Sequence, residues 1–117
     1  MGKLGSEAEK PIERRPRLRK RSLLGALITY ADGKFSFDCT IHDLSETGAR
    51  ITLPKNIQMP SRFYLINIRD RQACDAKIVW HKGSEAGVEF VRSFGLAEVS
   101  DPALNYLKRL WLERATR

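Results

Sequence analysis

The segment KFSFDCTIHDLSETGARITL, residues 34–53, decides the fold class of this chain. Apolar and polar residues alternate over residues 34–42 of the predicted strand 34–44, and the alternation resumes over residues 49–53 after the turn-forming residues 45–48. A period of two is typical of a strand that buries one face and exposes the other. The segment therefore predicts two antiparallel strands joined by a turn. The side chains expected on the core face are Phe35, Phe37, Cys39, Ile41, Ile51 and Leu53.

The same short, punctuated pattern continues on both sides, over residues 23–31, 62–68, 73–82 and 87–91. The pair Asp32-Gly33 between the first two strands favours a tight hairpin. Turns or loops are expected at residues 54–60, 69–72 and 83–86. Six short strands at this spacing predict a mainly β protein, either a small antiparallel barrel or a sandwich.

The C-terminal segment, residues 101–117, has a different pattern. Ser100 and Asp101 are candidate N-caps, and Pro102 suits a first helical turn. Apolar residues then recur at helical spacing, at Leu104, Leu107, Leu110 and Trp111. We predict a helix over about 101–115. Its apolar stripe either closes an open end of the barrel or pairs with a second chain, and a monomer is favoured.

The 117 residues fit one domain, and 42% apolar with 30% charged residues excludes a wholly disordered chain. The formal net charge is +7, but residues 1–22 hold eight basic and three acidic side chains, whereas residues 23–100 hold nine of each. The excess charge therefore belongs to an arm and predicts an anionic partner. No apolar run is long enough for a membrane span or a secretory signal, so we expect a cytoplasmic protein without membrane insertion.

These patterns divide the chain into four parts. They are a flexible N-terminus (1–13), an arginine-rich arm (14–22), a barrel (23–100) and a C-terminal helix that packs on the barrel (101–117).

The sequence offers little for catalysis or metal binding. Cys39 and Cys74 lack the close spacing and neighbouring histidines of a zinc site, and each lies in an alternating apolar run, so we predict buried thiols. Neither His42 nor His81 belongs to a motif that places it beside a nucleophile, and no phosphate-binding glycine loop occurs. We therefore expect a binding protein that is not an enzyme and holds no metal or cofactor.

Two features carry binding chemistry, and the first is RRPRLRKR, residues 14–21. Arg15 and Arg19 stand four residues apart, as do Arg17 and Arg21. A guanidinium group is permanently charged, binds phosphate or a guanine edge through two parallel hydrogen bonds, and stacks on flat rings. Taken alone, such a segment also occurs as a solvated basic tail.

The second feature is DLSETG, residues 43–48, between two predicted strands. Asp43 can accept hydrogen bonds from a guanine edge or hold an arginine, Ser45 can donate to a phosphate, and Gly48 permits close backbone approach or a positive φ. Taken alone, the same residues form a common serine or aspartate turn. Arg50 is expected on the outer face, paired with Asp43 or another surface acid.

Trp80 has two interpretations. It shares a strand face with Cys74, Ala76 and Ile78, which predicts that its ring packs in the core. The alternative is a position at the rim of the barrel, where the indole ring supports or stacks on a ligand.

The order of the two features resembles the PilZ domain of bacterial cyclic di-GMP receptors. In that family an R-x-x-x-R motif precedes the first strand, and a D-x-S-x-x-G motif lies between the second and third strands. Here Arg15 and Arg19 match the first motif. The second motif is matched by Asp43, Ser45 and Gly48. The stretches that also look like later strands of the family are 48–50, 78–80 and 87–90.

The resemblance, which covers about residues 12–92, implies a six-stranded antiparallel β-barrel with a flexible basic N-terminal arm and a flanking C-terminal helix. It also implies that cyclic di-GMP binds on the outer surface of the barrel and that the arm folds over it. Ordering of the arm would then signal to a protein effector in trans. The residues that the resemblance assigns to the ligand are Arg14, Arg15, Arg19, Asp43, Ser45 and Gly48, with Arg17, Arg21 and Trp80 as further candidates.

Two other functions fit parts of the sequence. One is a small nucleic-acid-binding barrel with a basic arm, although the balanced charge of residues 23–100 counts against a nucleic-acid groove. The other is a PilZ-like protein-interaction module that binds no nucleotide, although such a module would be expected to lack one of the two motifs. The downstream pathway, the number of nucleotides per site and the register of the arginine pair are left open.

Overall fold

The computed structural model describes residues 20–55 and 57–116, and for residues 20–22 the backbone alone. The expected flexible N-terminus, residues 1–13, lies outside the described residues. The predicted ligand residues that also lie outside them are Arg14, Arg15, Arg17 and Arg19, together with the side chain of Arg21. The described part comprises the barrel, with its first strand from Lys20 onward, and the C-terminal helix.

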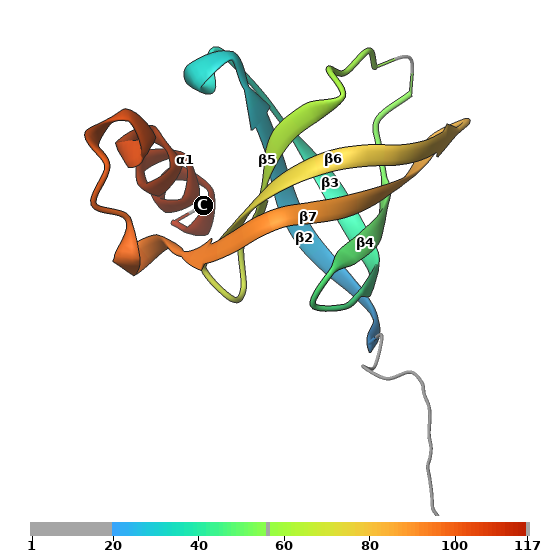
Figure 1. Cartoon of the computed structure of the whole chain (residues 1–117), viewed down its shortest axis with the longest axis horizontal. Helices are drawn as coiled ribbons and strands as arrows, with labels where there is room; N and C mark the ends of the chain where they lie inside the picture. The colour runs from blue at the N-terminus through green and yellow to red at the C-terminus, as the bar shows by residue number, and fades with distance from the viewer. Residues whose placement is uncertain (1–19, 56, 117) are drawn as a thin grey trace, which may run out of the picture.

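Six antiparallel strands form a closed barrel in the order β2-β3-β4-β7-β6-β5, and a helix lies against one side of it (Figure 1). The strands are β2 (Lys20–Tyr30), β3 (Phe35–Leu44), β4 (Gly48–Thr52), β5 (Arg62–Asn67), β6 (Gln72–Lys82) and β7 (Glu85–Gly95). The barrel closes because β2 pairs with β3 along one edge and with β5 along the other. The predicted six-stranded antiparallel barrel is confirmed, and the sandwich alternative is wrong.

The interior of the barrel is filled by side chains that the alternation along each strand points inward. Cys39, Ile41, Ile51 and Leu53 are all buried there, as predicted. Inward side chains of the other strands complete the core, and they are Leu24, Ala26, Ile28, Phe63, Leu65, Cys74, Ala76, Ala86 and Val88. Burial of one large aliphatic side chain stabilises the fold by roughly 1.5–3 kcal/mol.

The prediction that Phe35 belongs to this core is wrong, because its side chain is 55% exposed. The pairing of β3 with β4 begins at Thr40, so Phe35 lies on a part of the β2–β3 hairpin that extends beyond the closed barrel. There its ring stacks on Tyr30, with the two centroids 5.1 Å apart. Phe37 is half-buried against the edge of the core.

A short 3₁₀ turn, η2 (Ala31–Gly33), takes the place of the predicted two-residue turn between β2 and β3. Ala31 and Asp32 adopt positive φ angles of 54° and 57°, and Gly33 follows at 91°. A Cβ atom on Gly33 would lie 2.9 Å from Cδ2 of Tyr106 in the C-terminal helix. The hairpin tip therefore fits closely against the helix, a tertiary contact that the local sequence does not reveal.

The C-terminal helix begins later than predicted. A 3₁₀ turn, η4 (Pro102–Leu104), precedes α1 (Asn105–Ala115). The Asp101 carboxylate caps this turn by accepting a hydrogen bond from the Ala103 amide at 3.0 Å. A further 3₁₀ turn, η3 (Leu96–Glu98), follows β7. No helix of the described chain is long and apolar enough to cross a membrane.

Leu107 and Leu110 of α1 pack on the outer face of the barrel, against Leu27, Ile66 and Ala73. Because side chains alternate along each strand, these three barrel residues point outward and form an apolar patch that α1 covers. The prediction that the apolar stripe of the helix closes an open barrel end is therefore wrong.

Polar contacts from the C-terminal half of α1 also attach the helix to the barrel. Trp111 Nε1 donates a hydrogen bond to the Ile68 carbonyl at 2.8 Å, and the Arg71 guanidinium lies 5.2 Å from the indole centroid. Arg114 Nε lies 2.9 Å from Asp38 Oδ1 on β3. The helix is thus tied to the barrel by contacts that give it one orientation.

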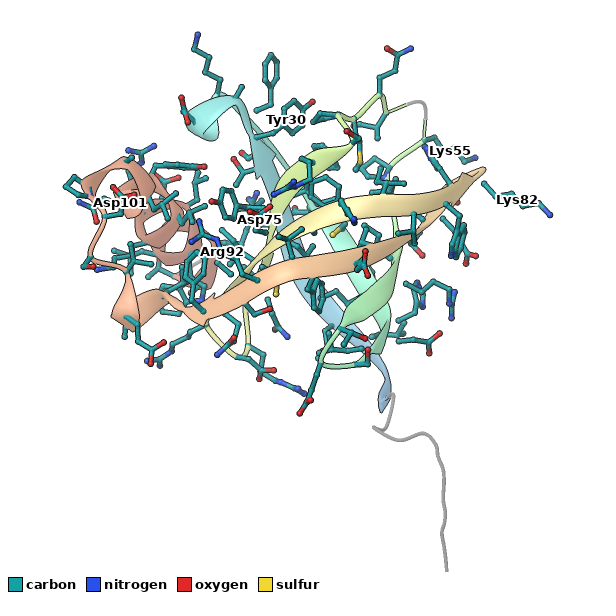
Figure 2. All side chains as sticks on the ribbon, in the orientation of Figure 1. Tyr30, Lys55, Asp75, Lys82, Arg92 and Asp101 are labelled. Carbon is teal, nitrogen blue, oxygen red and sulfur yellow. The ribbon has the colours of Figure 1, made fainter. Side chains whose placement is uncertain are left out.

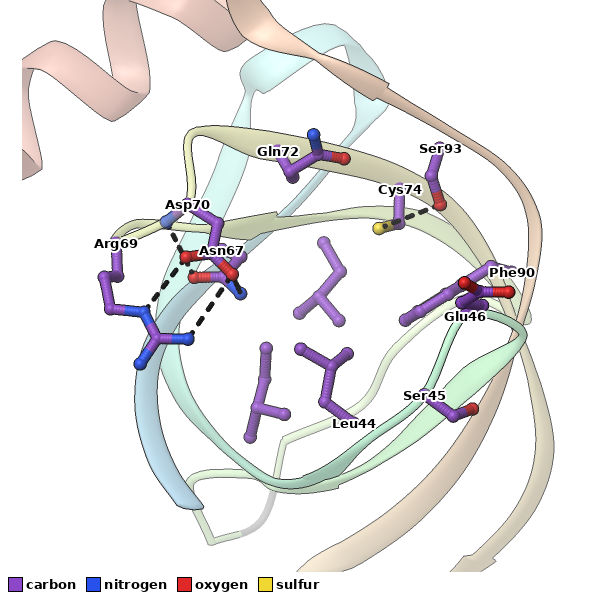
Figure 3. A pocket seen from close by; sticks show the side chains of 12 residues that line it. Leu44, Ser45, Glu46, Asn67, Arg69, Asp70, Gln72, Cys74, Phe90 and Ser93 are labelled. Carbon is purple, nitrogen blue, oxygen red and sulfur yellow. Dashed lines mark hydrogen bonds and ion pairs between the residues drawn. The ribbon is translucent and has the colours of Figure 1, made fainter. Parts of the chain in front are cut away.

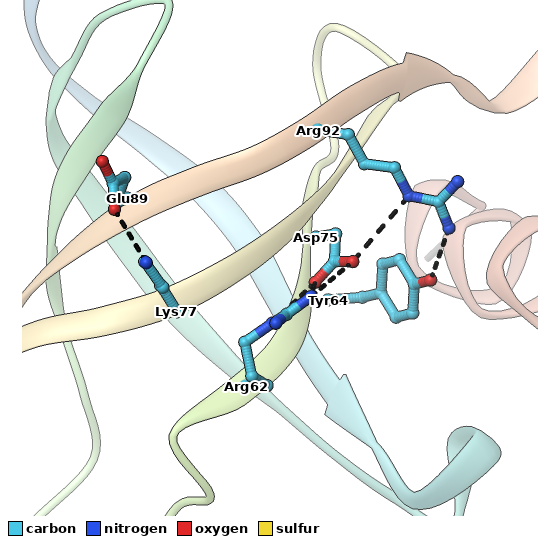
Figure 4. A network of polar contacts seen from close by, with 6 residues as sticks. All are labelled: Arg62, Tyr64, Asp75, Lys77, Glu89 and Arg92. Carbon is cyan, nitrogen blue, oxygen red and sulfur yellow. Dashed lines mark hydrogen bonds and ion pairs between the residues drawn. The ribbon is translucent and has the colours of Figure 1, made fainter.

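An ion-pair network on the outer face connects β5, β6 and β7 (Figure 4). Arg62 Nη2 donates to both carboxylate oxygens of Asp75 at 2.9 Å. Arg92 lies 3.8 Å from the same carboxylate and donates a 3.2 Å hydrogen bond to the Tyr64 hydroxyl. Figure 2 shows Asp75 and Arg92 on the side of the barrel nearer to α1. The network therefore supports the wall against which the helix packs.

The substitution Leu107→Ala tests the docking of the helix. The Leu107 side chain is fully buried, so its truncation is expected to lower the free energy of unfolding by about 2–5 kcal/mol. Leu112→Ala on the same helix is the matched control, because Leu112 is 54% exposed and its loss should cost less than about 0.5 kcal/mol. Urea denaturation measures both values, and equal effects of the two substitutions would contradict this packing.

Candidate ligand-binding site

A pocket of about 350 Å³ lies on the outer surface of the barrel, over β4 and β7 and beside the β3–β4 turn. Four residues singled out in the sequence line it together, namely Asp43, Ser45, Gly48 and Trp80. The other residues of this outer pocket are Thr47, Ala49, Arg50, Val79, Gly87, Val88 and Glu89. The fold therefore brings the barrel half of the predicted ligand set to one place.

Ser45 organises the β3–β4 turn. Its Oγ accepts hydrogen bonds from the Gly48 amide at 3.2 Å and the Thr47 amide at 3.3 Å. The Thr47 carbonyl in turn accepts a 2.8 Å hydrogen bond from the Phe90 amide, which attaches the turn to β7. The single hydroxyl hydrogen of Ser45 is directed at the Gly48 carbonyl, 3.2 Å away. Rotation about the C–O bond can redirect that hydrogen to an acceptor in the outer pocket.

Gly48 is required by the closeness of two strands. It pairs with Glu89 of β7, and a Cβ atom at this position would lie only 2.3 Å from the Val88 carbonyl oxygen. No side chain fits into that space, because real Cβ contacts are longer. Of the two roles predicted for this glycine, close backbone approach is therefore the one that the structure uses.

Arg50 links two acidic side chains at the edge of the outer pocket. Its Nε donates to Asp43 Oδ2 and its Nη1 donates to Glu85 Oε2, both at 2.9 Å. The hydrogen bond to Asp43 raises the pKa of the Arg50 guanidinium above its ordinary value. The predicted pairing of Arg50 with Asp43 is confirmed. Sequence reasoning left Arg50 outside the ligand set, whereas the structure places it on the pocket wall.

The prediction that Trp80 packs in the core is wrong, because its side chain is 44% exposed. Ile78 pairs with Val88 and Trp80 pairs with Gly87, so β6 has one more residue than β7 between these two pairs. Such a β-bulge reverses the alternation of side chains beyond it. The indole ring therefore lies at the outer pocket, which is the rim position of the alternative interpretation.

Gly87 provides the surface on which the Trp80 ring lies. A Cβ atom on Gly87 would be 2.1 Å from Nε1 of Trp80, and the two neighbouring ring atoms are almost as close. The ring therefore rests directly on the backbone of β7. The sequence analysis did not assign this role to Gly87. The signal for it in the sequence is that Trp80 and Gly87 lie on either side of a predicted turn, residues 83–86, so that the two predicted strands that contain them pair across it.

The described residues give the outer pocket no excess of positive charge. The guanidinium of Arg50 is shared by Asp43 and Glu85, and Glu89 lies 3.3 Å from Lys77. An anionic ligand would therefore need cations from another part of the chain.

The register of β2 locates the nearest source of such cations. Arg21 pairs with Asp43 and Lys20 pairs with Leu44, so the arginine-rich segment joins the barrel beside the outer pocket. Successive Cα atoms are about 3.8 Å apart, which keeps the Cα of Arg19 within about 8 Å of that of Arg21, and the Cα of Arg15 within about 23 Å. Both predicted arginine ligands are thus within reach of the pocket.

Neither cysteine takes part in the outer pocket. Both are buried free thiols, as predicted. Burial, with a smaller contribution from Asp38, raises the pKa of the Cys39 thiol to about 12, and burial also raises the pKa of Cys74. Among the described residues, no three His, Cys, Asp or Glu side chains gather into a group that could hold a metal ion.

The described residues thus form a closed six-stranded barrel that carries a pocket on its outer wall. The family model described as PilZ domain matches residues 13–110, and the chain belongs to the PilZ domain family. PilZ domains are generally modules that bind cyclic di-GMP, and they are receptor modules and not enzymes. The predicted family is confirmed.

One solved structure supports the fold. The chain is similar to the PilZ domain of CeSA from a cellulose-synthesizing bacterium, with a TM-score of 0.53 and 15% sequence identity. The match covers 84% of this chain and 98% of that one. At this identity the likeness concerns the fold alone. No curated protein matches the chain.

The substitution Gly87→Ala tests the seating of Trp80. Its new Cβ atom would displace the ring, so the indole Nε1–H resonance of Trp80 in a ¹⁵N NMR spectrum should shift strongly while that of Trp111 stays in place. Gly25→Ala is the matched control, because no heavy atom lies within 4 Å of a Cβ at that position. An unmoved Trp80 resonance in Gly87→Ala would contradict the described arrangement.

Proposed function

We propose that this protein is a non-enzymatic receptor for cyclic di-GMP, which it binds between the arginine-rich arm and the outer pocket. The observation that carries the proposal is the pairing of Arg21 with Asp43. In this register the last arginine of the arginine-rich segment lies opposite the aspartate of the second motif, at the edge of the outer pocket. A ligand that bears both phosphates and guanine bases matches the chemistry of both halves.

The barrel half of the site suits a guanine base. The Trp80 ring is exposed at the pocket and offers a flat surface for stacking, which contributes about 1–3 kcal/mol per base in nucleic-acid complexes. Asp43 is oriented by Arg50 and can accept from the N1 and N2 edge of guanine. Ser45 can turn its hydroxyl hydrogen from the Gly48 carbonyl to a ligand phosphate.

The arm half supplies the positive charge that the outer pocket lacks. Arginine forms paired hydrogen bonds with phosphate and with the O6/N7 edge of guanine, and these charge-assisted bonds are about twice as strong as neutral ones. The arm residues assigned to the ligand are Arg14, Arg15 and Arg19, with Arg17 and Arg21 as further candidates. A dianionic ligand thus couples the net positive arm to the nearly neutral barrel.

Ligand binding would position the arm against the barrel and present a new surface to a protein effector in trans, an order–disorder switch in which the ligand supplies the ordering energy. No cofactor or metal takes part in this scheme. The PilZ family match over residues 13–110 includes the arm, the barrel and the first part of α1, so the proposed switch lies within one domain.

Isothermal titration calorimetry with cyclic di-GMP tests the proposal. The wild-type chain should bind, and each of Arg15→Ala, Arg19→Ala and Asp43→Ala should weaken binding by about ten- to a hundredfold, because each removes a charge-assisted hydrogen bond. Arg109→Ala is the matched control, since Arg109 is exposed on α1 away from the pocket, and it should bind like wild type. Absence of binding by the wild-type chain would refute the receptor function.

A second comparison separates the receptor from a nucleic-acid-binding protein. Contacts that are mainly electrostatic weaken steeply as salt rises, so binding of single-stranded DNA through the arm alone should disappear at about 0.2 M salt. Cyclic di-GMP binding should persist there because stacking on Trp80 and contacts with Asp43 are less sensitive to salt. A gel shift with DNA that stays strong at this salt, with no cyclic di-GMP binding, would favour the nucleic-acid function.

A further inference from the structure

A second pocket of about 610 Å³ opens at the end of the barrel where β2 begins (Figure 3). Its wall is formed by five apolar side chains, Ile41, Leu44, Leu65, Cys74 and Phe90. Three of them belong to the barrel core, whereas Leu44 and Phe90 are only half-buried at its edge. We call this pocket the barrel mouth. The core is therefore left open at one end, with room for an additional apolar side chain against this wall.

The polar rim of the barrel mouth includes two acidic side chains, Asp70 and Glu46, which differ in their charged partners. Asp70 is held by Asn67 Nδ2 at 3.2 Å and by Arg69 Nε at 3.0 Å, so its charge is already matched. Glu46, on the β3–β4 turn, forms no ion pair with any residue in the described part of the chain. A segment that carries a positive charge next to an apolar side chain would complement both the wall and the rim.

The register of β2 brings one such segment to this place. Lys20 pairs with Leu44, a wall residue of the barrel mouth, and Arg21 pairs with Asp43 of the outer pocket. Ser45 lines both pockets, so the β3–β4 turn is the partition between them. The chain that precedes Lys20 therefore reaches the barrel at the boundary of the two pockets.

Odd-numbered and even-numbered residues of that segment are expected on opposite sides of an extended backbone. In extended backbone, successive side chains point to opposite faces. The observed register ends at Lys20; an extended backbone before it would put position 18 on the same side as Lys20 and Leu44, and positions 17 and 19 on the side of Arg21 and Asp43. Residues 14–19 read RRPRLR, in which Leu18 is the one aliphatic side chain apart from the proline ring.

We propose that Leu18 docks in the barrel mouth and anchors the arginine-rich arm to the barrel. The docked leucine adds to the apolar wall, and a basic side chain of the same segment pairs with Glu46. Anchoring at position 18 holds Arg17 and Arg19 on the side of the outer pocket before any ligand arrives. The consequence for nucleotide affinity rests on the proposed function, whereas the docking itself does not.

Alkylation of Cys74 in the full chain without nucleotide tests the docking, because this thiol lines the barrel mouth. Mass spectrometry after treatment with iodoacetamide gives a separate rate for each cysteine. Leu18→Ser should expose Cys74 and raise its rate by about tenfold. The rate at Cys39 should stay unchanged, because this buried core residue does not line the mouth and would react faster only if the barrel opened as a whole.

Leu4→Ser is the matched control, since it removes the other leucine of the N-terminal segment and should leave the Cys74 rate as in wild type. Equal Cys74 rates in wild type and Leu18→Ser would overturn the docking, and protection that grows with protein concentration would assign the barrel mouth to a second copy instead. Faster Cys74 alkylation in Leu18→Ser supports the docking even if calorimetry detects no cyclic di-GMP binding. Nucleotide binding with equal Cys74 rates would retain the receptor function and reject the anchor.

Discussion

The pairing of β2 with β5, which closes the barrel, is the contact on which the rest of the structure depends. Ala26 to Thr29 of β2 lie opposite Tyr64 to Asn67 of β5. Because successive side chains of β2 point to opposite faces of the barrel wall, they contribute to two cores. Ala26 and Ile28 fill the interior, and Leu27 faces the C-terminal helix. On its other edge β2 pairs with β3 as far as Lys20 and Arg21, and this pairing fixes where the described chain enters the barrel.

The candidate site depends on the close approach of two neighbouring strands and of one aromatic ring to the backbone, more than on an enclosed cavity. Gly48 allows β4 to approach β7, and Gly87 allows the Trp80 ring to rest on the sheet. The outer wall of a barrel is otherwise convex, so these two glycines produce the shallow pocket over β4 and β7. A flat base stacked on an indole suits such a surface, provided that a second element covers it. In the proposed function the arginine-rich arm is that element, and the charge and the pocket then come from different parts of the sequence.

Local patterns in the sequence predicted the elements, and contacts between distant segments decided where the predictions failed. The alternation of apolar and polar residues correctly predicted six strands and the burial of Ile41 and Ile51. These predictions succeed because they require only that each strand has one buried face and one face exposed to solvent. Phe35 lies beyond the end of the β3–β4 pairing, and Trp80 lies beyond a bulge. The alternation pattern of one strand reveals neither how far that strand pairs with its neighbour nor where a bulge interrupts the pairing. The two ligand motifs were recognisable by residue type and order, but Gly87 as a seat for Trp80 required the register of β6 on β7.

The central claim is that the arginine-rich arm and the outer pocket form one ligand site. An NMR titration of the ¹⁵N-labelled full chain with cyclic di-GMP tests it most directly, because every backbone amide reports separately. The account predicts concerted shifts at the amides of residues 14–21, at those of residues 43–50 and at the Trp80 indole, with one common affinity. Shifts confined to the arm, or arm and barrel shifts that follow different affinities, would contradict a single shared site.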